Sequence, residues 1–328
     1  MKKPVVSVVI PACNEAGNIR ELHGRVVAAL TGCVDAFEIL FVDDGSTDGT
    51  DGAVAALHES DKRVGLIQLS RNFGHQSALM AGLDHAKGEA VIAMDADLEH
   101  VPELLPELVA RWRHGAMVVQ TARIYPKTVG RLKRVTSGLF YAAMRKLSSV
   151  PLVPGATDFY LLDRKVVEAI KSCRETARFT RGLVSWVGYP RETVTYTSGQ
   201  RHAGVSKYGL ERMLTLGLDA VFAFSVAPIR LCGAAGLMAT LIGVCYLLYA
   251  AGVRLLGTGA VPGWASLVAV VVFMSGMQLI ILWIVGEYIA RIAEQTRNRP
   301  RYLVHRTLSP AGDMASPPDA SPRTGEVP

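Results

Sequence analysis

The stretch AVIAMDADL, residues 90–98, shows the pattern that decides the fold. It begins with five consecutive apolar residues and turns polar at Asp95 and Asp97. A short apolar run that ends in turn-forming residues is typical of a strand covered on both faces. We therefore predict a buried strand over Ala90–Met94, with the two carboxylates just beyond its carboxyl end.

The same pattern recurs on either side of this stretch. Apolar runs alternate with segments whose apolar residues have the spacing of a helix. Alternating strands and helices indicate right-handed βαβ units and a Rossmann-like, mainly parallel α/β sheet. The predicted strands are Val5–Ile10, Glu38–Val42, Val64–Leu69, Ala90–Met94 and Met117–Thr121, and the predicted helices are Asn18–Leu30, Thr50–Leu57, Gln76–His85 and Pro102–Trp112.

Polar residues follow each of these predicted strands. In an open parallel sheet, ligands bind just beyond the carboxyl ends of the strands. We therefore expect the polar residues to meet in one binding cleft. They are Asn14 and Glu15, Asp43 and Asp44, Arg71 and Asn72, Asp95 and Asp97, and Arg123.

The two acidic strand ends each have two interpretations. Asp95 and Asp97 can approach one ion if the chain turns after the strand, and such hard oxygen ligands suit Mg²⁺ or Mn²⁺, which also bind diphosphate oxygens. Capping of the next helix by Asp97 is the alternative. The segment DDGS, residues 43–46, fits either a tight turn with a helix cap or a site for a base or ribose hydroxyl.

Several motifs occur in order along residues 5–300. Together they resemble those of the GT-A-fold family 2 glycosyltransferases, in particular the polyprenyl-phosphate branch with dolichol-phosphate mannose synthase and the GtrB-type enzymes. The resemblance implies a GT-A catalytic domain followed by a two-helix transmembrane hairpin. The motifs are VSVVI (6–10), PACNE (11–15), FVDDGS (41–46), LSRNFG (69–74), MDADL (94–98), TDFYLLDR (157–164), FTRG (179–182) and AGVSKY (203–208).

The resemblance also assigns roles to individual residues. The catalytic residues are Asp97, Asp158 and Arg123, with Asp158 as an orienting group or weak base. The ligands of a Mg²⁺ or Mn²⁺ ion are Asp95, Asp97 and Glu99. The nucleotide-sugar donor is bound by Pro11, Asn14, Glu15, Asp43, Asp44, Arg71 and Asp95. The lipid phosphate is bound by Arg134, Ser137, Arg201, Ser206 and Lys207.

Three positions depart from the pattern of the family. Glu99 stands where relatives carry Gln, Cys13 where an aromatic residue is common, and Tyr160 where Arg is common. A carboxylate at position 99 would raise metal affinity but would also repel an anionic diphosphate. These departures leave the donor sugar open and do not change the reaction class.

The implied reaction is inverting transfer of a sugar from a UDP- or GDP-linked donor to a polyprenyl phosphate. A lipid monophosphate is mostly dianionic at pH 7, since its second pKa is near 6. The acceptor therefore needs arginines that neutralise and position it more than it needs deprotonation. The alternatives are a processive polysaccharide synthase of the same fold and a non-catalytic membrane scaffold. Such synthases usually carry a QxxRW segment, and neither Arg111-Trp112 nor Arg181-Gly182 supplies it.

Two apolar stretches predict a membrane anchor. Leu231–Val253 and Trp264–Gly286 would each form a helix of roughly 34 Å, enough to cross a hydrocarbon core of ~30 Å. Arg254–Gly263 joins them and carries one Arg. The segment after the second stretch carries Arg291, Arg297, Arg299, Arg301 and Arg306. The positive-inside rule then places the catalytic domain and both termini in the cytoplasm, in a multi-pass protein of the plasma (inner) membrane. A buried helical hairpin of a soluble protein is the alternative.

The sequence thus divides into four predicted parts. Residues 1–209 form the catalytic domain, 210–225 an amphipathic interfacial segment, 226–290 the two transmembrane helices, and 291–328 a basic segment with a disordered tail. The net charge of +6 suits anionic lipid, and nothing in the sequence favours nucleic acid. The five scattered cysteines predict neither a disulfide framework nor structural zinc. Relatives that form tetramers suggest a homo-oligomer.

Overall fold

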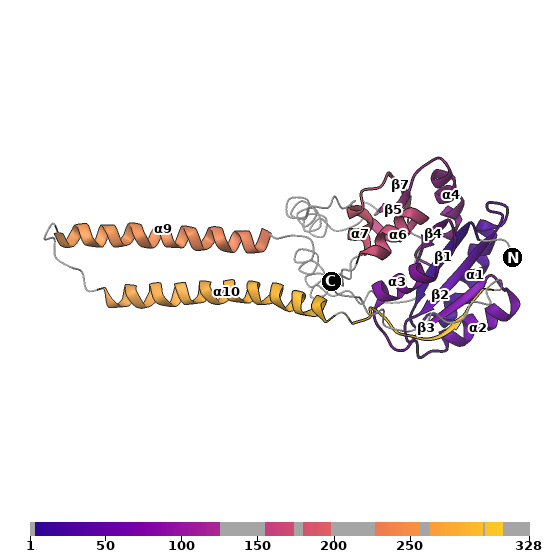
Figure 1. Ribbon diagram of the computed structural model, residues 1–328, viewed down its shortest axis with the longest axis horizontal. Helices are drawn as coiled ribbons and strands as arrows, with labels where there is room; N and C mark the ends of the chain where they lie inside the picture. Colours follow the sequence, from indigo (N-terminus) through magenta and orange to yellow (C-terminus); the bar gives the residue numbers. More distant parts are fainter. Residues whose placement is uncertain are drawn as a thin grey trace, which may run out of the picture.

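The computed structural model describes residues 4–124, 155–173, 180–197, 227–255, 263–297 and 299–310. Figure 1 shows an α/β part from which two long helices, α9 and α10, extend side by side. The α/β part contains one eight-stranded sheet with the strand order β7-β5-β6-β4-β1-β2-β3-β8. The strands are β1 (Val6–Ala12), β2 (Phe37–Asp43), β3 (Val64–Leu69), β4 (Ala90–Ala93), β5 (Val118–Ile124), β6 (Ala156–Asp163), β7 (Arg191–Thr197) and β8 (Val304–Leu308).

The centre of the sheet is parallel. Strand β1 pairs in parallel with β2 and β4, and β2 pairs in parallel with β3. Strands β6 and β8 flank this centre in antiparallel orientation, and β5 and β7 form a further parallel pair. Every residue of β1, β2 and β4 is buried, as expected for strands covered on both faces. The predicted mainly parallel α/β sheet is confirmed.

Helices cover both faces of the sheet (Figure 1). Helices α1 (Ala16–Leu30), α2 (Thr50–Ser60) and α4 (Leu105–Arg113) contribute side chains to one hydrophobic cluster, and α3 (His75–His85), α6 (Arg164–Ser172) and α7 (Thr180–Trp186) contribute to the other. A short 3₁₀ turn, Pro102–Leu104, leads into α4. The close approach of α3 to β1 depends on Gly82, where an added Cβ would lie 2.1 Å from Val9 Cγ1.

The chain returns to the sheet after the two long helices. Strand β8 pairs antiparallel with β3, and the Ser70 amide donates to the Leu303 carbonyl at 2.9 Å. The Tyr302 hydroxyl donates to Asp84 Oδ2 on α3 at 2.8 Å. This strand was not predicted from the sequence, where residues 291–328 were expected to form a basic segment followed by a disordered tail. The sheet of the catalytic domain therefore includes residues on both sides of the helical pair.

Helices α9 (Ala227–Leu255) and α10 (Trp264–Thr296) cover the two apolar stretches. Helix α10 continues well beyond the predicted end at Gly286. Among the described residues, the segment Phe273–Thr296 is long and apolar enough to cross a membrane, with a mean hydropathy of 1.5, and α9 contributes the shorter apolar segment Cys232–Cys245. The transmembrane hairpin stays a prediction.

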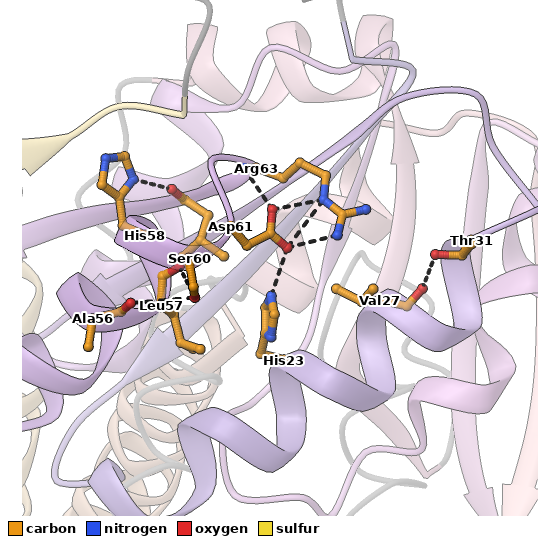
Figure 2. A network of polar contacts seen from close by, with 10 residues as sticks. His23, Val27, Thr31, Ala56, Leu57, His58, Ser60, Asp61 and Arg63 are labelled. Carbon is orange, nitrogen blue, oxygen red and sulfur yellow. Dashed lines mark hydrogen bonds and ion pairs between the residues drawn. The ribbon is translucent and has the colours of Figure 1, made fainter.

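A polar network joins α1 to the turn that precedes β3 (Figure 2). The Asp61 carboxylate accepts hydrogen bonds from Arg63 Nε at 2.9 Å and Arg63 Nη2 at 2.8 Å. His23 Nε2 lies 3.0 Å from Asp61 Oδ2, and the Arg63 guanidinium lies over the Phe37 ring. The hydrogen bonds from Arg63 hold the pKa of Asp61 well below its usual value. This network fixes the end of the sheet opposite the acidic strand ends.

We expect Asp61→Asn to lower the free energy of unfolding by about 1–3 kcal/mol, because the charge-assisted hydrogen bonds are lost in a mostly buried position. The pKa of Asp61 is lower in the folded than in the unfolded protein, so its stabilising contribution is present above a pH of about 4 and is lost as the pH falls further. Thermal unfolding at neutral pH and at acidic pH measures both effects. The difference in stability between the variant and the wild type should be smaller at acidic pH than at neutral pH.

Glu59→Gln provides a matched control for this prediction. Glu59 is 79% exposed and forms a pair with Lys62 at 3.2 Å. Exposed pairs of this kind contribute about 0–1 kcal/mol. Equal losses of stability in the two variants would contradict the role given to Asp61.

Candidate active site

The loops after β1 and β2 are joined by hydrogen bonds. The Asn14 amide donates to Ser46 Oγ at 2.9 Å, and the Thr47 amide donates to Asn14 Oδ1 at 2.9 Å. Asn14 adopts a left-handed conformation with φ 59°, which Asn tolerates better than most residues. The Glu15 amide donates to Thr50 Oγ1 at 3.0 Å, at the start of α2. The structure therefore brings the first two predicted groups of donor-binding residues together.

Asp44 links the loop after β2 to the loop after β3. Its carboxylate accepts from the Phe73 amide at 2.7 Å and from the Gly74 amide at 3.0 Å. Gly45 permits the close contact between the loops, since it has φ +70° and an added Cβ would lie 2.6 Å from the Asn72 amide nitrogen. Burial raises the pKa of Asp44, while these two amide hydrogen bonds oppose the rise. Asp44 thus positions the backbone of the loop after β3 against the loop after β2.

The two carboxylate oxygens of Asp43 differ in their hydrogen bonding within the described residues. Asp43 is buried, and its Oδ1 accepts from the Ser46 amide at 3.1 Å. Its Oδ2 is buried and has no hydrogen-bond partner among the described residues. A buried acceptor without a donor is costly. This oxygen is therefore suited to accept a hydrogen bond from a ligand.

The chain turns sharply after β4, as the metal hypothesis requires. Leu98 has φ 61°, and the Glu99 amide donates to Asp97 Oδ1 at 3.0 Å. Asp97 thus forms a local turn and does not cap the 3₁₀ turn, whose N-cap is Val101. Burial raises the pKa of Asp97, and the charges of Asp95 and Glu99 raise it further against the hydrogen bond from the Glu99 amide. Clustered carboxylates of this kind favour a cation.

The fit to a divalent ion rests on two carboxylates. Asp95 Oδ1 is buried and accepts no hydrogen bond within the described part of the chain. In that same part, no three His, Cys, Asp or Glu side chains gather closely enough to hold a metal unaided. Mg²⁺ is commonly bound by one or two carboxylates together with substrate phosphates and water. Asp95 and Asp97 fit that arrangement.

Arg123 and Glu99 form an ion pair. Arg123 Nη2 donates to Glu99 Oε2 at 2.8 Å, and both side chains are mostly buried. The pair joins the turn after β4 to the end of β5. Glu99 therefore has a cationic partner from the protein itself, and its role as a third metal ligand stays a prediction.

Asp158 lies on β6 and is reached by two residues at the start of α3. The Gln76 amide group donates from Nε2 to Asp158 Oδ2 at 3.3 Å, and its Oε1 accepts from the Thr180 amide at 2.9 Å. His75 Nε2 lies 3.5 Å from Asp95 Oδ1 and 3.6 Å from Asp158 Oδ2. His75 thus bridges the turn after β4 and strand β6. Asp158 is 6% exposed, so its direction is set by these neighbours.

A second histidine lies beneath Asp95. His100 is buried, and its Nδ1 accepts from the Asp95 amide at 2.9 Å. Its ring stacks on Phe159 with centroids 5.1 Å apart. Burial lowers the pKa of His100, and this outweighs the nearby carboxylates, which raise it. Gln76 and both histidines were not predicted from the sequence, although His75 and Gln76 directly follow the motif LSRNFG.

The predicted residues differ in how the structure places them. Pro11 is in β1, and Arg71 lies in the loop after β3 with its guanidinium 4.1 Å from the Phe73 ring centroid. The predicted lipid-phosphate ligands lie outside the described residues, as does the predicted interfacial segment 210–225. Those ligands are Arg134, Ser137, Arg201, Ser206 and Lys207.

A mainly parallel α/β sheet binds its ligands at the carboxyl edge, where the acidic loops of this chain lie. The profile of "Glycosyl transferase family 2" matches residues 7–171. The chain belongs to this family, and the protein is a glycosyltransferase with a GT-A-like fold.

Its relatives place it further within the family. It is 37% identical over 302 residues to the SfII prophage-derived bactoprenol glucosyl transferase of Shigella flexneri, covering 92% of this chain and 98% of the relative. It is 36% identical to the uncharacterized glycosyltransferase YkcC of Bacillus subtilis, covering 92% and 93% of the two chains. A solved mannosyltransferase from Pyrobaculum calidifontis, in complex with GDP-Man and Mn²⁺, has a TM-score of 0.47 at 20% identity and covers 91% of this chain and 89% of its own.

Proposed function

We propose that this protein transfers one sugar from a nucleoside-diphosphate sugar to a polyprenyl phosphate at the cytoplasmic face of the membrane. The observation that carries the proposal is the match to a bactoprenol glucosyl transferase over 98% of that relative's length. The match is long enough to include both the α/β domain and the helical pair. A non-catalytic scaffold does not fit the acidic site described above.

The loops after β1, β2 and β3 would bind the nucleotide. Asp43 Oδ2 offers a free acceptor at this edge of the sheet. Uracil and guanine each carry a ring N–H that could donate to a carboxylate oxygen, so the site suits UDP- and GDP-linked donors alike.

Asp95 and Asp97 would hold Mg²⁺ or Mn²⁺ together with the donor diphosphate. When bound, the ion neutralises the charge that develops on the departing nucleoside diphosphate. Glu99 would join them only by exchanging its ion pair with Arg123. Otherwise Arg123 keeps Glu99 neutralised and limits its repulsion of the diphosphate.

Asp158 and His75 would face the reacting sugar and the acceptor. The acceptor phosphate is already mostly dianionic at pH 7, so it attacks the anomeric carbon without a strong base and inverts its configuration. Asp158 would then orient the acceptor or the sugar hydroxyls, held by Gln76. The predicted basic residues Arg134, Arg201 and Lys207 would neutralise the acceptor phosphate.

The topology of the sheet supports a double crossing of the membrane. Strand β7 precedes the helical pair and β8 follows it, and both belong to the same sheet. If α10 crosses the membrane, the chain must therefore cross once more to return to the catalytic domain. Helix α9 is the apolar helix that could do so. The catalytic domain and residues 299–310 would then lie on the same side of the membrane, and the positive-inside rule favours the cytoplasmic side.

Purified full-length protein should release nucleoside diphosphate only when a polyprenyl phosphate and Mg²⁺ or Mn²⁺ are both present. We would test UDP-glucose, UDP-N-acetylglucosamine and GDP-mannose, and identify the lipid product by mass spectrometry. The expected product carries one sugar. The unphosphorylated polyprenol is the control and should not react. Lipid-independent polymer formation would instead support a processive synthase, and no lipid product with any UDP- or GDP-sugar would overturn the proposal.

A further inference from the structure

His100 has a fixed tautomer because of the hydrogen bond that it accepts. Its Nδ1 lies 2.9 Å from the Asp95 amide nitrogen, which can only donate. Nδ1 is therefore the unprotonated nitrogen, so that any ring proton is on Nε2. Nε2 lies 3.6 Å from Asp95 Oδ2, beyond hydrogen-bond distance.

His100 consequently holds Asp95 at its backbone amide. The left-handed turn at Leu98 brings residue 100 back beneath residue 95. The stacked Phe159 ring on β6 prevents the imidazole from turning away. Phe159 is completely buried in the core beneath the sheet, so the ring on which the imidazole stacks is itself held in place. The hydrogen bond and the stacked ring together hold the backbone from which the Asp95 carboxylate projects.

The Asp95 carboxylate itself lies between two histidines. His75 Nε2 is 3.5 Å from Oδ1 and His100 Nε2 is 3.6 Å from Oδ2. Oδ1 is buried and accepts no hydrogen bond in the part of the chain that the structure describes. A histidine that served only to fill the core would not need an acceptor nitrogen at this backbone amide. In metal sites, groups that orient a ligand in this way affect metal affinity substantially.

We propose that His100 is a positioning residue that holds the backbone of Asp95 in the turn from which its carboxylate reaches the divalent ion. The inference rests on the proposed function, since it assumes that Asp95 is a metal ligand. His100 does not touch the ion, the donor or the acceptor. Its contribution is to fix the turn before the ion arrives.

Three substitutions separate this role from simple packing. His100→Asn keeps an acceptor near the position of Nδ1, His100→Gln moves the amide group to the position of Nε2, and His100→Phe keeps the stacking on Phe159 without any acceptor. Binding of Mn²⁺ to the full-length protein, alone and with UDP or GDP, can be followed by electron paramagnetic resonance. This readout does not depend on turnover.

We expect His100→Phe and His100→Gln to weaken Mn²⁺ binding by about 10–100-fold, the usual effect of losing a group that orients a metal ligand. His100→Asn should stay within about threefold of the wild type. Thermal unfolding reports whether each variant is folded, and the comparison of Asn with Gln holds even if the Phe variant does not fold.

The outcomes separate the inference from the function on which it rests. Wild-type affinity for Mn²⁺ in the folded Gln and Phe variants would overturn the positioning role alone. Equal weakening in the Asn and Gln variants would also overturn it, because only packing would then matter. Absence of Mn²⁺ binding in the wild type, with or without nucleotide, would overturn the metal site together with this inference.

Discussion

Asp97→Asn is expected to reduce turnover by roughly a thousandfold. A catalytic metal ion contributes several kcal/mol to the stabilisation of developing charge, and about 4 kcal/mol corresponds to three orders of magnitude in rate. The substitution keeps the shape of the side chain and one acceptor oxygen for the Glu99 amide. The turn should therefore survive while the negative charge that favours the ion is lost. Release of nucleoside diphosphate with saturating donor and Mn²⁺ measures the effect.

Asp35→Asn is a suitable control for this experiment. Asp35 is exposed and precedes β2 at the opposite end of the strand from the site. The turnover of the Asp35→Asn variant should match that of the wild type. Turnover of the folded Asp97→Asn protein within threefold of the wild type would show that Asp97 is not needed for the ion.

Asp44→Ala should raise the KM for the donor by about a hundredfold. The carboxylate accepts two backbone hydrogen bonds, and hydrogen bonds to a charged group contribute about 1.5–3 kcal/mol each. Without it, the amides of Phe73 and Gly74 lose their acceptor, and the loop after β3 separates from the loop after β2. Because this loop is expected to bind the nucleotide, donor affinity should fall more than kcat. Steady-state kinetics with varied donor separates the two.

Two further variants make this prediction specific. Asp44→Asn keeps one acceptor oxygen and should raise the donor KM less than Asp44→Ala. Asp51→Ala, on α2, removes only an acceptor for the Gln68 side chain and should leave the KM nearly unchanged. If Asp44→Ala lowered kcat and left the KM for the donor unchanged, the loop-positioning role would be wrong.

The centre of the fold and much of the candidate site were predictable from the sequence. Strands such as Val6–Ala12 are buried on both faces, so their apolar runs are continuous and end visibly at the first polar residue. That same change from apolar to polar marks the carboxyl ends of the strands. The acidic residues of the site therefore follow from the pattern that reveals the strands.

The remaining site residues depend on geometry that no pattern records. His100 reaches Asp95 only because Leu98 takes a left-handed conformation, which is uncommon for a branched apolar residue. Gln76 reaches Asp158 across the interface between α3 and β6, from a position distant in the sequence. Strand β8 is short and basic, and its strand conformation comes from pairing with β3 rather than from its own composition.

The return of the chain to β3 makes the helical pair an insertion within a domain. A fragment that stops before α9 would lack β8 and would leave β3 as a bare edge, a template for aggregation. It would also lose the hydrogen bond from Tyr302 to Asp84 on α3. A water-soluble version of the enzyme should instead replace the helical pair with a flexible linker and retain residues 299–310. In this sense the predicted membrane anchor is a long loop between two strands, open to exchange without rebuilding the sheet.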